Sequence, residues 1–253
     1  YTQVVMSTHS THLSEVSDIE KVNVMKKINE KISLVMKPTL GLDKFGADVL
    51  DYKGMSFSKI LSRYLDAKRS VLLFSKGVIL VEGDGEEILI PALSKKVLGV
   101  SLDEMGIGLI NIGSVGFENI ACIFDQSRLQ RKCSIVTDLD TVVTGAKKSK
   151  EKAMLLGYSR KEKLSNLFDE NLYVESFYAP HTLEIDFASE ENNRCFVCTV
   201  IRRTYSNIET KKKHISAVQS GTESERYDSV MTVATKIKKG WYATLLAEAI
   251  DSS

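Results

Sequence analysis

This 253-residue sequence has no long hydrophobic run and no marked excess of charge of either sign. No apolar stretch approaches the ~20 residues that a helix needs to span a bilayer, and no signal peptide is visible, so we expect no membrane partner. Lysine and arginine number 34, against 33 aspartates and glutamates. Bulk charge therefore does not indicate a nucleic-acid partner, and any basic surface has to be local.

Cysteine is also scarce, with four residues in the chain. Cys122 and Cys133 lie among apolar residues, and we expect them to be small core side chains. Cys195 and Cys198 form a single CxxC pair, but no second cysteine or histidine pair follows at the spacing of a zinc site. Free cysteines suit a reducing compartment, so we expect a cytoplasmic protein.

Hydrophobic residues make up 43% of the chain, enough for a sizeable core. Gln3 to Met6 is apolar and predicts a buried strand. Because chains rarely start within a strand, we expect further residues before it. Two more strands are predicted at Lys21 to Met25 and Lys31 to Met36, and a turn-rich boundary at Pro38 to Gly46. From about Asp48 to Leu72 apolar residues recur at helical spacing, which predicts a helix.

The middle of the chain alternates between predicted strands and helices. Val78 to Val81, Gly108 to Gly113 and Cys133 to Thr137 are apolar runs typical of strands buried on both faces. Helices are predicted between them, at Glu86 to Val97 and Phe117 to Leu129. The core face of the first helix is expected to include Leu89 and Val97. This β-α-β-α-β order predicts an α/β fold with a central, mostly parallel sheet and helices on both faces.

The last part of the chain is basic and mainly helical. A further strand is predicted at residues 172–178, and helices from Leu183 onward. Basic runs occur at Lys147 to Lys163, Arg202-Arg203 and Lys211 to Lys213. Such runs are usually solvated faces, but beside a phosphodiester-cleaving site they would also provide a track for a DNA backbone.

Acidic residues follow two of the predicted strands. Glu82 follows the first strand, and Glu86 lies four residues later in the first turn of the next helix. Asp138 and Asp140 close the third strand, and Gly83 allows a tight turn after Glu82. Because ligands gather at the carboxyl ends of parallel strands, four carboxylates there would repel one another without cations between them. The pattern predicts a Mg²⁺ or Mn²⁺ site; the alternative is two solvated acidic loops.

The same residues resemble the motifs of a known domain. Val78 to Gly83 and Ile135 to Asp140 resemble the two signature motifs of the Toprim domain, which topoisomerases, primases, small ribonucleases and OLD (overcoming lysogenization defect) nucleases share. Val81 to Pro91 is similar to the OLD branch in particular, as is Lys239 to Ala247. Val4 to Ser10 resembles the last conserved block of the ABC-type ATPase domain that precedes Toprim in OLD proteins.

The resemblance implies a Toprim fold, with a Rossmann-like central sheet, flanking helices and additional helices. We expect the end of an ABC-type ATPase domain at residues 1–45, a helical connection at 46–76 and the Toprim domain at 77–253. The implied activity is a two-metal DNA endonuclease, coupled to ATP in the full protein and acting in anti-phage defence. DNA, a second copy of the chain bound through the ATPase region and a defence-system protein are the implied partners.

The resemblance also implies roles for the acidic residues. Glu82 would be the central metal ligand and a candidate general base, and Asp138 and Asp140 would hold a metal ion from the opposite side. Glu86 and Glu184 would support the second metal ion, directly or through water. Without the resemblance, Glu184 would be interpreted as a capping or exposed acid.

Lys239 is the implied catalytic lysine, which stabilises charge on the transition state or the leaving oxygen. Lys236 and Lys238 lie near enough in sequence to be confused with it. His9 resembles the histidine with which ABC-type ATPases sense the γ-phosphate. The GxxxxGK[ST] phosphate loop is absent from the sequence, so His9 acts on nucleotide only together with an upstream ATPase region.

Four further residues are expected to support the metal ligands rather than bind metal themselves: Gly83, Gly113, Ser114 and Thr141. Gly113 and Ser114 follow the second predicted strand and should line the same edge. Thr141 is placed to donate a hydrogen bond to a ligand carboxylate.

Three other functions are alternatives to the nuclease. A topoisomerase needs a nucleophilic tyrosine on a separate domain and a primase needs a zinc module and a template-binding domain, and neither is visible. The alternative from a different class is a regulatory or assembly subunit of an ATPase complex, whose acids bind metal without turnover.

Overall fold

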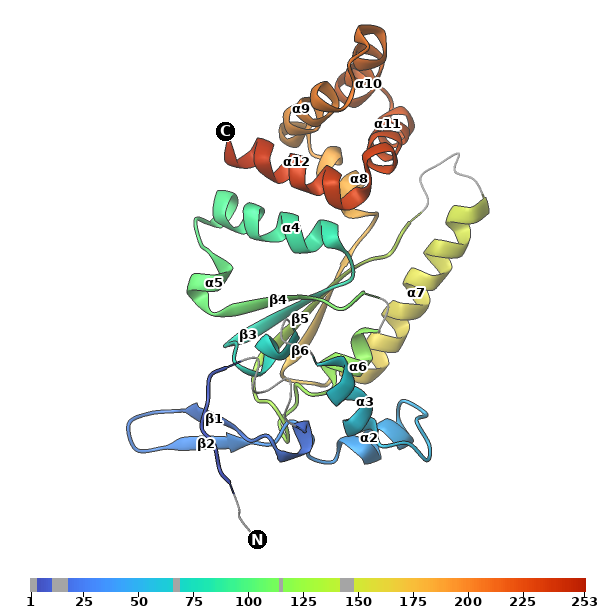
Figure 1. Cartoon of the computed structure of the whole chain (residues 1–253). Helices are drawn as coiled ribbons and strands as arrows, with labels where there is room; N and C mark the ends of the chain where they lie inside the picture. Colours follow the sequence, from blue (N-terminus) through green and yellow to red (C-terminus); the bar gives the residue numbers. More distant parts are fainter. Residues whose placement is uncertain (1–3, 11–17, 66–68, 114–115, 142–147) are drawn as a thin grey trace.

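The computed structural model of the chain describes residues 4–10, 18–65, 69–113, 116–141 and 148–253. Three parts follow one another along the molecule (Figure 1). A β-hairpin and short helices form the N-terminal part, a parallel sheet lies in the middle, and a group of helices forms the C-terminal part.

The central sheet has four strands in the order β4-β3-β5-β6, and every neighbouring pair is parallel. Its strands are β3 (Gly77–Val81), β4 (Ile107–Asn111), β5 (Lys132–Asp138) and β6 (Val174–Ala179). Leu80 on β3 and Ile135 on β5 are fully buried. These are the apolar runs that predict strands covered on both faces, and the expected α/β fold class is confirmed.

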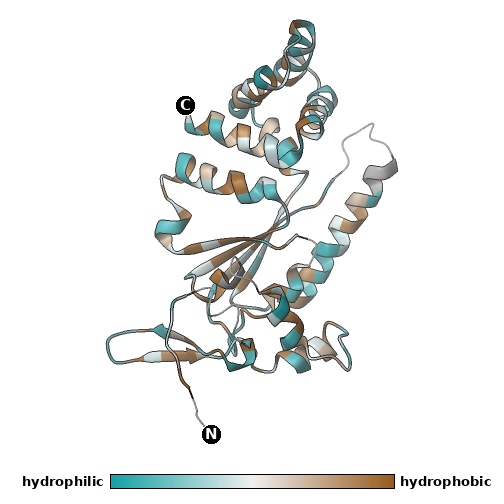
Figure 2. Cartoon of the chain, viewed as in Figure 1, coloured by the Kyte–Doolittle hydropathy of each residue, from teal (hydrophilic) through white to brown (hydrophobic). Residues whose placement is uncertain are grey.

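Helices cover both faces of the sheet (Figure 1). On one face lies α4 (Asp84–Leu93), which continues into the π-helical turn Ser94–Leu98 and is followed by α5 (Leu102–Met105). On the other face lie α6 (Phe117–Ala121) and α7 (Lys148–Phe168). Figure 2 shows that hydrophobic residues concentrate on the strands, while the helices alternate between hydrophobic and polar residues, as expected for helices with one buried face.

The buried side chains form two hydrophobic clusters. The first joins the N-terminal part to the sheet, α6 and α7, through residues such as Leu61, Leu80 and Leu164. The second joins Leu89 of α4 to the C-terminal helices. These helices are α8 (Leu183–Ser189), α9 (Arg194–Thr204), α10 (Ile208–Ser220), α11 (Glu223–Ile237) and α12 (Lys239–Asp251). Helix α4 is thus the link between the sheet and the C-terminal helices.

The N-terminal part begins with the short 3-10 helix Ile19–Lys21. An antiparallel hairpin follows, made of β1 (Val24–Lys27) and β2 (Ser33–Met36). Helices α2 (Leu42–Asp48) and α3 (Phe57–Tyr64) and the 3-10 helix Arg69–Leu73 then lead to the sheet. The domain boundaries expected at residues 45/46 and 76/77 stay a prediction.

The helix expected from about Asp48 to Leu72 is wrong as a continuous element. Helix α2 ends at Asp48, and Gly54 has a φ of +75°, which is outside the helical region. A new helix starts after Ser56, whose side chain accepts a hydrogen bond from the Lys59 amide as an N-cap. Within the expected range the structure has α3 and the 3-10 helix Arg69–Leu73, and the apolar residues before Phe57 continued the helical spacing without forming a helix.

Two other expected elements also differ from the structure. Val4 to Met6 are exposed and lie in no strand, because no described strand lies beside them to pair with. The helix expected at Phe117 to Leu129 ends at Ala121. Beyond it the chain forms a loop that the buried Arg128 side chain holds by donating to the Cys122 carbonyl. The expected burial of Val97 is wrong, since this side chain is 72% exposed.

Replacing Leu80 by alanine should destabilise the protein by about 3 kcal/mol, because a fully buried side chain in the central strand would leave a cavity. Urea unfolding followed by circular dichroism measures the change. Val97→Ala is the matched control, and we expect it to alter stability by less than about 0.5 kcal/mol. Equal unfolding midpoints for Leu80→Ala and the parent protein would contradict the assigned core.

Candidate metal centre

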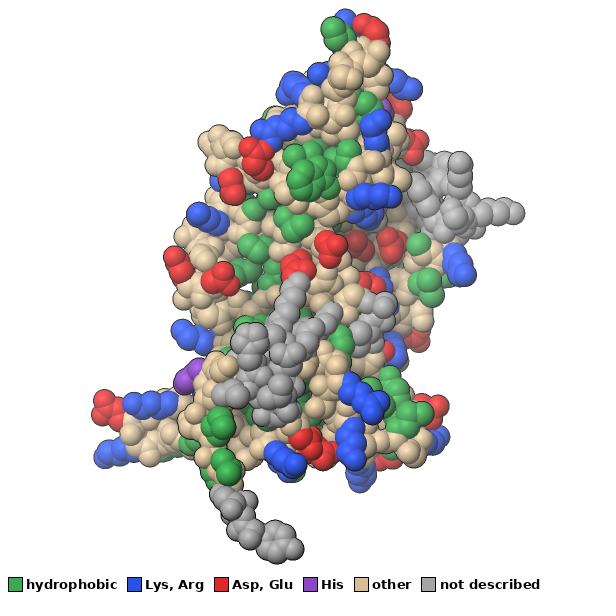
Figure 3. Space-filling view, viewed as in Figure 1, with side chains coloured by type: hydrophobic (Ala, Val, Ile, Leu, Met, Phe, Trp, Pro, Cys, Tyr) green, Lys and Arg blue, Asp and Glu red, His purple; other side chains and the backbone are tan. Residues whose placement is uncertain are grey.

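Acidic residues meet at the carboxyl edge of the sheet. Glu82 follows β3 directly, and Asp138 is the last residue of β5. Glu184 lies in the first turn of α8, which follows β6, and is only 6% exposed. Figure 3 shows acidic side chains gathered across the middle of the molecule, between the C-terminal helices and the N-terminal part. Parallel strands bring these residues together because they end at the same edge.

The carboxylates at this edge interact electrostatically. Burial, followed by the charges of Glu86 and Asp140, raises the pKa of Asp138 to about 8. Burial also raises the pKa of Glu86, and the charges of Glu184 and Glu82 act in the same direction. The five acids expected in the site therefore lie close enough to repel one another, and the edge favours a bound cation.

Lys239 is the lysine that contacts these acids. Its Nζ lies 3.2 Å from Oε2 of the buried Glu184. Lys236 instead places its ammonium group 4.8 Å from the ring centre of Tyr205. Lys238 forms the junction between α11 and α12 with a φ of +73°, a value that few residues other than glycine adopt. The structure thus separates three lysines that the sequence leaves equivalent.

The sequence interpretation missed Arg160 as a site residue. This side chain reaches from α7 and places Nη1 2.9 Å from Oε2 and 3.1 Å from Oε1 of Glu82. Its Nη2 donates to the Asp138 carbonyl at 2.7 Å. Arg160 had been grouped with the basic run Lys147 to Lys163, which was interpreted as a solvated face or a track for a DNA backbone. No spacing signal relates it to Glu82, because 78 residues separate the two.

Other members of the same basic run also contact the protein itself. Lys163 forms an ion pair with Glu118 at 2.6 Å, and Lys161 lies 5.2 Å from the ring centre of Tyr178. These lysines therefore help to attach α7 to helix α6 and strand β6. The side chains of residues 147–151 lie outside the described part of the chain.

A second layer of polar contacts surrounds the acids. The Thr137 hydroxyl donates to Glu82 Oε2 at 3.3 Å. The Asn111 amide, at the end of β4, donates to Asp84 Oδ1 at 2.9 Å. Gly113 adopts a φ of +58° and its backbone N–H donates to the Asn111 side chain, which connects Gly113 to the same edge. Thr137, Asn111 and Asp84 were missed because single polar residues at strand ends carry little sequence signal.

The structure places the other residues expected near the site in different ways. Gly83 leaves room for the Glu86 carboxylate, whose Oε2 would lie 2.7 Å from a Cβ at that position. The Thr141 amide donates to the Pro180 carbonyl, and its hydroxyl has no hydrogen bond to a carboxylate among the residues described. Ser114 lies outside the described residues. His9 is exposed beside Phe74, which precedes the amino end of β3, and is not brought to the acids.

The residues at this edge fit a hard divalent cation in their chemistry. They supply carboxylate oxygens, the preferred ligands of Mg²⁺ and Mn²⁺, and burial together with the neighbouring carboxylates raises the pKa of Asp138. Across the described ranges, however, no three His, Cys, Asp or Glu side chains lie at the spacing of a metal-binding group. Glu82 is held by Arg160 and Glu184 by Lys239, so the ligands are partly engaged by the protein's own cations.

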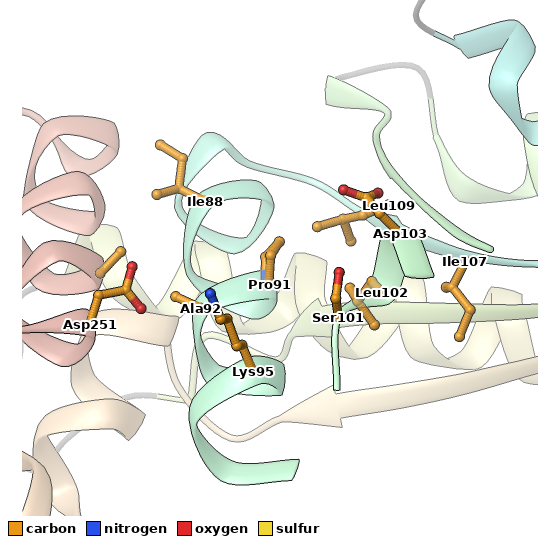
Figure 4. Close-up of a pocket in the computed structure, with 11 residues that line it drawn as sticks. Ile88, Pro91, Ala92, Lys95, Ser101, Leu102, Asp103, Ile107, Leu109 and Asp251 are labelled. Atoms are coloured by element: carbon orange, nitrogen blue, oxygen red, sulfur yellow. The ribbon is translucent and has the colours of Figure 1, made fainter. Parts of the chain in front are cut away.

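A separate pocket of about 340 Å³ lies between α4, β4 and the end of α12 (Figure 4). Its walls are mainly apolar, with Pro91 and Leu109 among them, and Lys95, Asp103 and Asp251 provide charged groups. The pocket is therefore distinct from the acidic edge, whose carboxylates do not line it.

Comparison with known proteins identifies the fold of this edge. Residues 73–140 match the family described as overcoming lysogenization defect protein-like, TOPRIM domain. The chain carries an OLD-like Toprim domain. The matched residues include β3, β4 and β5 and four of the five acids discussed above. Toprim domains generally bind divalent metal ions such as Mg²⁺, in agreement with the donor chemistry of the edge.

Solved structures resemble the chain beyond the matched residues. The C-terminal region of the Burkholderia pseudomallei OLD protein is 24% identical with a TM-score of 0.51, and the likeness covers 69% of this chain and 88% of that one. The C-terminal region of the Xanthomonas campestris pv. campestris OLD protein is 24% identical with a TM-score of 0.46, covering 70% and 85%. The first likeness shows a shared fold. No curated protein sequence matches this chain.

Together these findings confirm the resemblance to the C-terminal region of OLD proteins and the Toprim fold class. Within the described part of the chain, no helix is both long and apolar enough to cross a membrane.

The contribution of Asp138 to the stability of the OLD-like Toprim domain in EDTA should decrease as pH rises from about 4 to 8. The pKa of Asp138 is about 8 in the folded state against an ordinary 3.8, so the folded state binds more protons across this window. The amide of Asp138→Asn does not titrate. We therefore expect the stability of this variant, relative to the parent protein, to increase by about 1 kcal/mol or more between pH 5 and 8.

Urea unfolding at the two pH values tests this expectation. Asp169→Asn, which changes an exposed aspartate directly after α7, is the matched control and should give the same stability difference at both values. If Asp138→Asn behaved like this control, the close packing of carboxylates would be wrong.

Proposed function

We propose that this chain is a divalent-metal-dependent endonuclease that hydrolyses phosphodiester bonds in DNA. The observation that carries the proposal is the acidic edge of the OLD-like Toprim domain, where a lysine from α12 joins carboxylates from β3, β5 and α8. Acids that bind metal and a cation that faces them are the groups that phosphodiester hydrolysis requires.

The acidic side chains would divide two tasks. Glu82, Asp138 and Asp140 would hold one Mg²⁺ or Mn²⁺ ion, with Glu86 and Glu184 supporting a second. When bound, the ions supply charge stabilisation for the phosphoryl oxygens. Glu82 is 46% exposed and adjoins solvent, so it is also the carboxylate placed to accept a proton from an attacking water.

Lys239 would act on the opposite side of the reaction. Its side chain is half exposed, while its partner Glu184 is buried and holds the ammonium group at the edge. An ammonium group so placed stabilises negative charge on the pentavalent transition state or on the leaving oxygen. The pairing with Glu184 also explains why the neighbouring Lys236 is not equivalent.

The proposal extends to the longer protein through the N-terminal segment. Val4 to Ser10 resembles the end of an ABC-type ATPase domain, which supports coupling of cleavage to ATP, with His9 sensing nucleotide when the upstream region is present. Pairing of two copies through that region, and a partner protein in anti-phage defence, belong to the same proposal. They rest on the family resemblance and not on the geometry of the site.

One observation favours the alternative of a regulatory, non-catalytic metal-binding subunit. The described acids do not form a closed group at metal-ligating distances, since Arg160 and Lys239 engage two of them. A protein that bound Mn²⁺ yet cut no DNA would have this alternative function.

Supercoiled plasmid should be nicked or linearised in Mg²⁺ or Mn²⁺ and remain intact in EDTA. Glu82→Ala and Lys239→Ala should each lower the initial rate by at least about 100-fold, because each removes a group that acts on the reacting phosphate. Lys236→Ala is the matched control, since it removes the same charge three residues earlier, and we expect it to cut at nearly the parent rate.

The assay is repeated with the upstream ATPase region restored, in ATP. Cleavage that persisted in Lys239→Ala would exclude the assigned role of this lysine. Complete inactivity of the folded protein with every cation would overturn the nuclease and favour the regulatory subunit.

Trp241 offers a measurement of DNA binding that is independent of cleavage. It is the only tryptophan in the chain, is 59% exposed and lies on α12, the helix that begins with Lys239. A base of bound single-stranded DNA would stack on this exposed ring, so an oligonucleotide added in EDTA should quench the intrinsic fluorescence. Trp241→Ala should weaken binding by about 1 kcal/mol or more, roughly fivefold, as measured by fluorescence anisotropy of labelled DNA.

Trp241→Phe is the control that keeps an aromatic face without the signal, and its affinity should stay near that of the parent protein. Tight binding of DNA with unchanged tryptophan emission would show that the strand lies elsewhere.

A further inference from the structure

Arg160 makes the most extensive contacts with the acidic edge of any basic residue described. Its guanidinium group binds both carboxylate oxygens of Glu82 through Nη1, at 2.9 and 3.1 Å, and the Asp138 carbonyl through Nη2 at 2.7 Å. The side chain is 23% exposed, and its buried Nε has no hydrogen-bond partner among the described residues. Arg160 therefore joins the ends of β3 and β5 directly.

The contact differs from an ion pair between two exposed side chains, because the guanidinium is mostly buried and also binds the Asp138 carbonyl. Charge-assisted hydrogen bonds are among the strongest that side chains form. Arg160 also lies on a helix of 21 residues, whose Leu164 and Phe168 belong to the hydrophobic cluster under the sheet. The guanidinium is thus delivered by a rigid element and not by a mobile loop.

The position of Arg160 conflicts with full use of Glu82 as a ligand. The oxygens of Glu82 that would bind a cation are those that accept from Nη1. Arg160 also adds one positive charge to an edge whose attraction for a cation depends on its negative charge. This conflict gives a physical reason why the described acids do not form a closed ligating group.

We propose that Arg160 competes with the divalent ion for Glu82, holding this carboxylate in the metal-free site and releasing it when metal binds. The inference rests on the proposed metal-dependent function and adds a residue that tunes it. In the metal-free protein Arg160 balances part of the repulsion among the acids. Its release on metal binding leaves a guanidinium group beside the site, able to contact a phosphate.

The competition has a direction that can be measured without DNA. Removing the guanidinium frees Glu82 and makes the edge more negative, so the affinity for Mn²⁺ should rise. We expect Arg160→Ala to lower the Kd for Mn²⁺ on the order of tenfold, and Arg160→Lys to lower it less, since lysine keeps the charge but loses the planar fork. If Arg160 only supported the fold, its replacement would raise the Kd for Mn²⁺, because loosened ligands bind metal more weakly.

Lys161→Ala is the matched control for the loss of one positive charge from α7. Lys161 is the next residue, but it lies over the Tyr178 ring and no hydrogen bond or ion pair joins it to the acids described. We expect its Kd for Mn²⁺ to stay within about twofold of the parent value, because a charge outside the contact is screened. Comparing the two variants separates the contact with Glu82 from the general field of the helix.

The experiment is isothermal titration calorimetry of the purified chain with Mn²⁺, with free Mn²⁺ also followed by electron paramagnetic resonance. Circular dichroism melts in EDTA establish that each variant is folded, and Arg160→Lys provides the measurement if Arg160→Ala does not fold. Tighter binding in the Arg160 variants, with Lys161→Ala unchanged, supports the competition.

Two other outcomes overturn the inference in distinguishable ways. If the parent protein binds Mn²⁺ and both Arg160 variants bind it equally well or more weakly, the competition is contradicted. The proposed metal-dependent function is then not affected. An absence of Mn²⁺ binding in the parent protein and in both folded Arg160 variants contradicts the competition and the metal-dependent function together.

Discussion

Repulsion between carboxylates at one edge of the sheet is the constraint on which this structure depends. Three parallel strands end beside one another, and the chain places acids after each of them or in the helix that follows. Such an arrangement opposes folding unless positive charge is supplied, because burial and like charges both disfavour the charged carboxylates, and both raise the pKa of Asp138. The protein supplies part of it internally, through Arg160 on Glu82 and Lys239 on Glu184.

Packing elsewhere in the fold positions the side chains of Arg160 and Lys239 at this edge. Helix α7 packs on the face of the sheet that carries the first hydrophobic cluster, and it brings Arg160 to the strand ends. Helix α12 packs against α4 and α9 within the second cluster, and its first residue is Lys239. Both helices are long and well buried on one face, so the positions of their charged residues are fixed by packing rather than by loops.

The sequence predicts the parts of this arrangement that local patterns record. Apolar runs identified β3, β4 and β5, and the acids that follow Val81 and Thr137 marked the edge at which the carboxylates gather. Family motifs added Glu184 and Lys239, which composition and spacing alone do not distinguish from ordinary surface charges. The structure places Glu184 in a buried position beside Lys239.

Contacts between segments that are distant in the sequence could not be predicted from local sequence patterns. The pairing of Arg160 with Glu82 depends on how α7 packs under the sheet, and nothing in the basic run distinguishes this arginine from its neighbours. The non-helical stretch before Phe57 was missed because Leu50 and Phe57 keep the apolar spacing of a helix across the turn at Gly54. Burial of Val97 was expected from its spacing in the predicted helix Glu86 to Val97, but it lies in the π-helical turn Ser94–Leu98, where it is exposed.

The two hydrophobic clusters have a consequence for how the site can respond to its surroundings. Arg160 belongs to an element anchored in the first cluster, whereas Glu184 and Lys239 belong to helices anchored in the second. The site thus lies at the boundary between the parts of the chain that pack in the two clusters, and α4 connects these parts. A force or a bound protein that tilts the C-terminal helices would move Lys239 and Glu184 as a unit, while Glu82 and Arg160 stay with the sheet.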